Sequence, residues 1–346
     1  MQRDVQGLEA WVAWLGEVDI PVLGQTARDL ARLREDPKRL DARNVSQIVA
    51  RDPLMSVKLL RRFQHDRRKS EFPEFTQIER VVIMMGLEAF FDRVPTQPLV
   101  ENVLRTNLDA LTMLLRSVRR SHRASKYAGD WAVMLHDLHF DEIRTAACLY
   151  DFADQLLWCF APVRMIAMRN AHRADRSLRS KDAQEAVFGF AFVDLQTALA
   201  RQWGLPPLLL EAMANACSLQ ARLQNVILAV NVTRHSARGW DDAALPDDYE
   251  EIAHLLRIPA SQVADLVGAP LDLPLPADEA QAPVDGGTTG TTGAPGAPGA
   301  TGAPPGPRPG GCTGSHAPAA PESAAHGAAV RRAAAAALAL KPPMAA

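Results

Sequence analysis

The chain has 346 residues, of which 47% are hydrophobic and 23% are charged, and its formal net charge is −2. This is an ordinary composition for a globular protein. A net charge so near zero provides no overall field that would draw the chain to nucleic acid or to an anionic membrane. None of the four cysteines forms a Cys-x-x-Cys pair, which favours a reducing cytoplasm. The N-terminus lacks a signal-peptide pattern, and no apolar run approaches the roughly 18 residues of a membrane span.

The N-terminal third predicts a series of short helices. Residues 7–35 carry apolar side chains at helical spacing on both sides of Pro21, which predicts two helices. Asp41 or Asn44 can cap a third helix. In Asp52–Pro53, a capping aspartate precedes a proline at the first position of a fourth helix.

Two further signals follow in the chain. Thr76, with Glu79 three residues later, predicts a capping box at the start of a helix. Gly86 interrupts the next apolar run, which indicates either a turn or the close approach of another backbone.

Residues 97–128 predict one or two helices, and residues 131–140 a connection. At about 100° per residue, one face is predicted to be apolar and to point to the core, and a neighbouring face to be basic. The apolar face carries Leu108, Leu111, Leu115, Val118 and His122, and the basic face carries Arg116, Arg119, Arg120 and Arg123.

The remainder also predicts helices, and no segment shows the alternation of a strand. The predicted helices cover residues 142–160, 163–174, 182–203, 207–236 and 247–267. Gly204 followed by Leu205–Pro206 marks a helix end. From about residue 270, Pro, Gly, Ala and Thr dominate, which predicts a disordered tail.

Four segments in order carry a resemblance to a known family. They read IVARDPLMSVKLLRRFQ, FTQIERVVIMMGLEAF, AACLYDFADQLL and RQWGLP. Together they resemble the HDOD domain, an HD-related output domain of bacterial signalling proteins. The resemblance implies an all-α, multi-helix HD-like bundle, a cytoplasmic location and a non-catalytic regulatory role. The implied organisation is a lead-in (1–14), the HDOD-like domain (15–215), a helical extension packed on it (216–268) and the disordered tail (269–346).

The metal-ligand positions of HD phosphohydrolases are largely replaced. By the resemblance, His122 stands at the first histidine, Tyr150–Asp151 at the His–Asp pair, and Phe192 at a later histidine. A phenol is protonated near neutral pH and is a poor replacement ligand. Only His122 and Asp151 remain, so we expect vestigial positions, no metal, no other cofactor and no catalysis.

An alternative is a degenerate metal-dependent phosphohydrolase. The chain contains a His136–Asp137 dipeptide with His139 nearby, about 14 residues before the position of the family's pair. The His136–Asp137 pair, together with His122 and Asp151, supplies the candidate ligands of that alternative, and His139 is not a clear ligand partner. The place of the pair in a predicted connection favours coincidence instead.

Two basic clusters are the candidate interaction surfaces. The first is the basic face of Arg116, Arg119, Arg120 and Arg123, and the second contains Arg61, Arg62, Arg67, Arg68 and Lys69. We expect an unidentified signalling protein as the partner and no membrane. Nucleic-acid binding is a further alternative, but no interleaved aromatic residues or known fold motif favours it. The sequence leaves the oligomeric state open.

Overall fold

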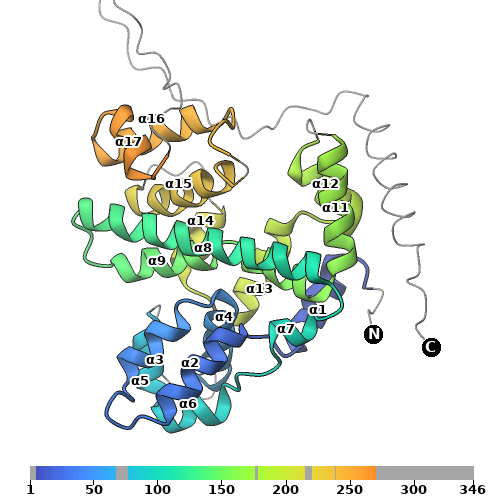
Figure 1. Ribbon diagram of the computed structural model, residues 1–346, viewed down its shortest axis with the longest axis vertical. Coiled ribbons are helices and arrows are strands. Elements are labelled where there is room, and N and C mark those ends of the chain that lie inside the picture. Colours follow the sequence, from blue (N-terminus) through green and yellow to red (C-terminus); the bar gives the residue numbers. More distant parts are fainter. Residues whose placement is uncertain (1–4, 68–76, 176–177, 215–219, 238, 270–346) are drawn as a thin grey trace, which may run out of the picture.

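The computed structural model describes residues 5–67, 77–175, 178–214, 220–237 and 239–269, and the described chain is built from helices (Figure 1). The helices are α1 (Leu8–Glu17), α2 (Gly24–Arg34), α3 (Ala42–Val49), α4 (Pro53–Arg67), α5 (Ile78–Met85), α6 (Leu87–Arg93), α7 (Val100–Val103), α8 (Leu108–Met134), α9 (Phe140–Leu149), α10 (Phe152–Phe160), α11 (Pro162–Ala174), α12 (Ser180–Phe188), α13 (Phe192–Trp203), α14 (Pro207–Ala214), α15 (Ala221–His235), α16 (Leu245–Leu256) and α17 (Ala260–Leu266). Within those ranges the only β-type pairing is an isolated bridge between Val22 and Leu99. The all-α prediction is confirmed. The expected tail from residue 270 onward and the Thr76 cap lie outside the described residues.

The long helix α8 runs through the middle of the molecule, and the other helices are arranged around it (Figure 1). Helices α9, α10 and α15 pack directly on α8. Helices α2 to α6 form a group on one side, and α15 to α17 lie on the other side of α8. Over the part of the chain that is described, no helix has the length and apolar content needed to cross a membrane.

The face of α8 that points to the core differs from the predicted one. Leu108 and Leu115 are 68% and 40% exposed, so the expected leucine face is wrong at these two positions. The buried face consists mainly of small side chains, which let the backbones of α10 and α15 approach closely. Besides the aromatic rings of Tyr127 and Trp131, its residues are Ala110, Leu114, Ser117, Val118, Ser121, Ala124, Ala128, Gly129 and Ala132.

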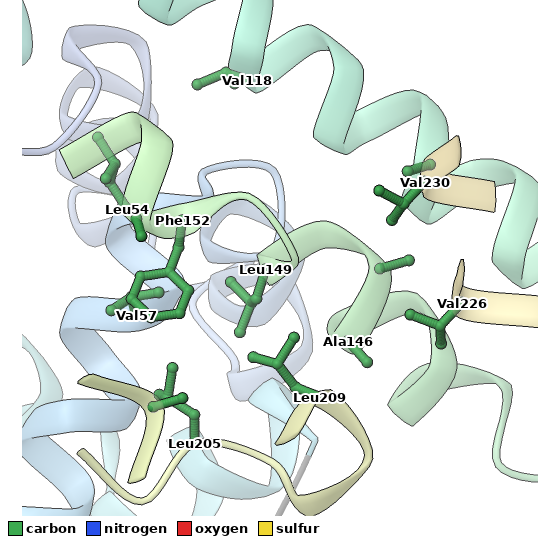
Figure 2. Close-up of a cluster of buried hydrophobic side chains, with 14 of the residues drawn as sticks. Leu54, Val57, Val118, Ala146, Leu149, Phe152, Leu205, Leu209, Val226 and Val230 are labelled. Atoms are coloured by element: carbon green, nitrogen blue, oxygen red, sulfur yellow. The ribbon is translucent and has the colours of Figure 1, made fainter. Parts of the chain in front are cut away.

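The apolar run 142–160 is broken into α9 and α10 at Tyr150–Asp151 and does not form one helix. Leu149 and Phe152, on the two sides of the break, are fully buried. Figure 2 shows them in a core to which α4, α8, α14 and α15 also contribute. Full burial of one such side chain contributes about 1.5–3 kcal/mol, so the break lies in one of the best-packed parts of the molecule.

Two other predicted boundaries are corrected. The expected helix 182–203 is divided into α12 and α13, because Gly189 takes a left-handed conformation (φ 85°) that ends α12. The expected connection 131–140 begins later, since α8 continues to Met134.

The capping predictions are confirmed where the chain is described. Asp41 accepts a hydrogen bond from the backbone N–H of Asn44 (2.7 Å) and caps α3. Asp52 accepts from the N–H groups of Leu54 (3.0 Å) and Met55 (3.1 Å) at the start of α4. Gly86 has φ 81° and separates α5 from α6, so the turn is the correct alternative there.

Candidate functional site

The break between α9 and α10 is held by a glutamine from α13. The side-chain amide of Gln196 donates to the carbonyl of Tyr150, and its oxygen accepts from the N–H of Ala153 (3.4 Å). One amide therefore satisfies the last turn of α9 and the first turn of α10, both of which lack partners within their own helices. Because the helix stops here, Tyr150 and Asp151 are turned toward α15.

Arg234 of α15 meets the carboxylate of Asp151. The guanidinium forms an ion pair with Asp151 and also lies 5.1 Å from the centre of the Tyr150 ring. Burial on its own raises the pKa of Asp151, but the neighbouring Arg234 and Arg120 outweigh it and hold that pKa below its ordinary value. Asp151 is therefore ionised and its charge is already neutralised.

Asp154, in the first turn of α10, extends this cluster. Its carboxylate accepts from the Ser117 hydroxyl (2.7 Å) and lies 3.6 Å from the guanidinium of Arg120. Burial raises the pKa of Asp154, and the nearby charge of Asp151 acts in the same direction. Two carboxylates and two guanidinium groups thus form one part-buried network, which we call the Asp151 cluster (Asp151, Asp154, Arg120 and Arg234).

The other two predicted ligand positions do not turn toward Asp151. The imidazole Nε2 of His122 donates to the backbone carbonyl of Arg51, in the connection between α3 and α4. Phe192 is 8% exposed and makes an edge contact with Phe188 (centroids 5.2 Å apart). The structure therefore brings Tyr150 and Asp151 together with Arg234, and leaves His122 and Phe192 in other interactions.

These residues do not fit a divalent ion. Asp151 is neutralised by a guanidinium, Tyr150 keeps its proton because burial raises its pKa, and Phe192 has no donor atom. Among the described residues, no three His, Cys, Asp or Glu side chains converge in a way that could hold a metal. We therefore derive no metal-dependent step.

The His136–Asp137 pair and His139 lie at the turn between α8 and α9. His136 ends α8 with φ 55°, and the carboxylate of Asp137 lies 2.8 Å from the Nε of Arg222. The ring of His139 is 3.7 Å from that carboxylate and 61% exposed. Both aspartates proposed as metal ligands are thus paired with arginines of one helix, α15.

The four arginines of α8 do not form one free surface. Arg116 and Arg119 are exposed. Arg120 belongs to the Asp151 cluster, and Arg123 lies between the rings of Tyr127 (5.7 Å) and Trp240 (5.5 Å). Only Arg116 and Arg119 are available to a partner without disturbing internal contacts.

The second basic cluster is also partly internal. Arg61 donates to the carbonyl of Val18 (2.9 Å) at the end of α1 and lies 5.3 Å above the Trp203 ring. Arg62 pairs with Asp66 (3.3 Å) on the exposed side of α4. The side chain of Arg67, and Arg68 and Lys69 as a whole, lie outside the described residues.

Sequence reasoning missed Arg234, Gln196 and Asp154. Arg234 lies in the last turn of a helix whose central part is buried, and a charged residue that follows such an apolar segment is the signal that could have drawn attention to it. Its partner is 83 residues away. No periodicity links positions at that separation.

One family model matches the chain over most of its helical part. The sequence model of the HDOD domain matches residues 20–218, more than half of the chain. Among solved structures, the MmoQ response regulator from Methylococcus capsulatus matches with a TM-score of 0.52 and 14% identity, over 73% of this chain and 99% of that one.

Two further solved structures are similar. A virulence factor from Campylobacter jejuni matches with a TM-score of 0.52 and 17% identity, over 77% of this chain and 94% of that one. An HDOD domain protein of unknown function from Geobacter sulfurreducens matches with a TM-score of 0.40 and 17% identity, over 75% and 93%. At these identities the first two likenesses establish the fold alone. No curated protein matches the sequence.

Proposed function

The chain belongs to the HDOD domain family, and on that premise we propose that it is a non-catalytic regulatory module that binds a partner protein in a bacterial signalling pathway. The observation that carries the proposal is the ion pair between Asp151 and Arg234. A carboxylate whose charge is met by a guanidinium has no free charge with which to bind a divalent ion. The similarity to a solved response regulator agrees with a role in signalling.

The proposed contact surface is the outward face of the first half of α8. Leu108 and Leu115 are exposed there, and Arg116 and Arg119 lie beside them. Arginine is enriched in protein interfaces, and exposed leucines next to it supply apolar area. No described residue forms an ion pair with either arginine. This narrows the predicted basic face to its two exposed members.

Charge reversal tests the contact surface. Arg116→Glu with Arg119→Glu is expected to abolish capture of the partner from bacterial lysate without changing the melting temperature. Arg80→Glu with Arg201→Glu makes the same change in net charge at exposed positions on α5 and α13, and should capture normally. Equal capture by the two double variants would show that this face is not the interface.

Metal analysis tests the non-catalytic part. After incubation with Mn²⁺ or Fe²⁺ and desalting, the purified chain should retain far less than one metal ion, and should not hydrolyse a generic phosphodiester. The competing proposal is the degenerate phosphohydrolase. Bound metal together with turnover, both lost in His122→Ala and in Asp151→Asn, would establish that alternative and remove this one.

A further inference from the structure

A cavity of about 500 Å³ lies between the α3–α5 group and the α8–α9 pair. Its floor is formed by buried residues, among them Ile78, Cys148 and Leu149. Its mouth is formed by exposed ones, among them Arg51 and Phe140. Small-molecule pockets in proteins usually measure roughly 300–1,000 Å³, so this one has room for a nucleotide-sized ligand.

Three arginines from three segments line this cavity. Arg43 lies in the first turn of α3, Arg51 in the connection to α4, and Arg144 in α9. Arg144 forms a long ion pair of 3.8 Å with the exposed carboxylate of Asp141, three residues earlier in α9. No described residue forms an ion pair with Arg43 or Arg51. Arginine donates in a planar fork that matches the oxygens of a phosphate, so unpaired guanidinium groups beside a cavity favour a phosphorylated ligand.

The acidic residues of the lining limit the charge of that ligand. Glu79 and Asp141 also border the cavity, which leaves a formal lining charge of +1 (three arginines against two carboxylates). The Cys148 thiol on the floor is neutral at physiological pH, because burial raises its pKa to about 12. A single phosphate group is therefore matched better than a polyphosphate chain.

The remaining lining can recognise a heterocycle. The Phe140 ring is 37% exposed and can stack on a planar group. The side chains of Gln47, Gln77 and Glu79 offer hydrogen-bond donors and acceptors at the mouth. The hydroxyls of Ser46 and Ser56 already donate to backbone carbonyls (2.8 and 2.9 Å), so they can only accept from a ligand.

Two features of α8 position these arginines. His122 donates to the backbone carbonyl of Arg51 and fixes that residue at the rim. Gly129 leaves space for the stem of Arg144, because a Cβ added at Gly129 would lie 2.6 Å from Cγ and Cδ of Arg144. A glycine inside a helix costs about 1 kcal/mol relative to alanine, and the crossing of Arg144 is the reason for it here.

We propose that this cavity binds a nucleoside monophosphate, with its phosphate on Arg43, Arg51 and Arg144 and its base against Phe140. The site is separate from the Asp151 cluster and from the exposed face of α8. Its failure would therefore leave the proposed regulatory role intact.

Isothermal titration calorimetry of the full chain tests this proposal. The probes are AMP, GMP, CMP and UMP, with the matching nucleosides and inorganic phosphate as the two halves of the ligand. At least one nucleotide should bind saturably, and each half should bind at least about tenfold more weakly, since both halves contribute contacts. No heat from any nucleotide at millimolar concentration would overturn the proposal, and so would inorganic phosphate binding as tightly as the nucleotides.

Variants locate the site. Arg43→Gln with Arg51→Gln should weaken nucleotide binding by about tenfold or more, because each removes a charge-assisted hydrogen bond to phosphate. Phe140→Ala should weaken it less and should not change phosphate binding. Arg80→Gln, an exposed arginine of α5 that does not line the cavity, is the matched control and should bind as the unmodified chain does. Unchanged affinity in the Arg43/Arg51 double variant would place the ligand elsewhere and overturn the proposal.

Discussion

Two groups of arginines lie on or beside α8, and they differ in whether a carboxylate pairs with their charge. In the Asp151 cluster, Arg120 and Arg234 face the carboxylates of Asp154 and Asp151. At the cavity, Arg43 and Arg51 meet no carboxylate of the described chain, although Glu79 and Asp141 lie along the same lining. We call the first group closed, because each guanidinium faces a carboxylate of the chain, and its ion pairs hold helices together. We call the second group open, because its guanidinium groups have no such partner among the described residues and are available to a ligand.

The difference separates two roles of a charged residue in an HD-like fold, one in the stability of the fold and one in the binding of a ligand. A buried ion pair does not by itself show that the pair stabilises the fold. Removal of one partner is nevertheless destabilising, because it leaves an uncompensated charge. An unpaired arginine at a cavity adds little to folding and can contribute directly to binding. Mutations in the two groups should therefore have opposite signatures, a loss of stability in the first and a loss of ligand in the second.

The largest effect on the free energy of unfolding is expected from Arg234→Met. This substitution keeps much of the side-chain volume and removes the charge that faces Asp151. Loss of a partner from a fully buried pair costs about 3–5 kcal/mol. The Arg234 side chain is 43% exposed, so we expect about 2–3 kcal/mol in the free energy of unfolding measured in urea. Arg119→Met, at an exposed position of α8, should change it by less than about 0.5 kcal/mol.

The pH dependence of that loss identifies Asp151 as its cause. The depressed pKa of Asp151 gives a stabilisation that is present above the ordinary value of 3.8 and is lost as the pH falls through the folded-state pKa. Without Arg234, burial raises this pKa and only the charge of Arg120 still opposes the rise. The penalty of Arg234→Met should then shrink as the pH falls from neutral and Asp151 becomes protonated. A penalty that does not change with pH would point to lost packing instead.

The second effect is expected from Gln196→Leu, which tests the break between α9 and α10. The substitution leaves the carbonyl of Tyr150 without the amide that it contacts and the N–H of Ala153 without its acceptor. An unsatisfied buried polar group costs about 1–3 kcal/mol, and we expect about 1–2 kcal/mol in urea unfolding. Gln47→Leu, at the exposed mouth of the cavity, is the control and should be close to neutral. A neutral Gln196→Leu would mean that packing alone holds the break.

Signals within a few residues of a helix end predicted the helices well. The features that the sequence did not predict depend on contacts between residues far apart in the chain. Asp41, Asp52 and Gly204 act within a few residues, and each ends or begins a helix where the sequence indicates it. The break at Tyr150–Asp151 could not be predicted from the apolar run, because the side chain that stabilises it comes from α13. The pairing of Asp151 with Arg234 could not be predicted for the same reason, because Arg234 comes from a distant helix, α15.

The misassigned face of α8 has a different cause. Large apolar side chains were expected to face the core, yet Leu108 is 68% exposed, whereas Ser117 and Ser121 are buried. The core side of this helix is crossed closely by α10 and α15, so small residues fit where leucines would collide. Hydropathy does not record how near a neighbouring helix lies.

A smaller effect, on the pH dependence of the free energy of unfolding, is expected from the pair that His235, at the end of α15, forms with Asp248 of α16. The hydrogen bond that His235 donates to the carboxylate of Asp248 raises the pKa of His235 above 6.5. The nearby Asp242 adds to the rise, and burial and Arg234 oppose it. A raised histidine pKa gives a stabilisation that is complete below the ordinary value and is lost as the pH rises through the folded-state value. The ring is 35% exposed, so we expect only about 0.5–1 kcal/mol.

Urea unfolding between about pH 6 and pH 9 measures this loss. Asp248→Asn should remove most of the pH dependence, because the partner charge is gone. His254→Gln, on the same helix as Asp248, should leave it unchanged. If Asp248→Asn keeps the full slope, another titrating group is responsible.

The smallest effect is expected from Arg43→Gln with Arg51→Gln. Both side chains are exposed and no described carboxylate pairs with either, so their removal breaks no ion pair. The free energy of unfolding should change by less than about 0.5 kcal/mol. A loss of several kcal/mol would mean that these arginines, like Arg234, are held by partners within the chain, and the contrast between a closed and an open group would no longer hold. A near-neutral result together with weakened nucleotide binding would show that the same residue type stabilises the fold beside Asp151 and binds a ligand at the cavity.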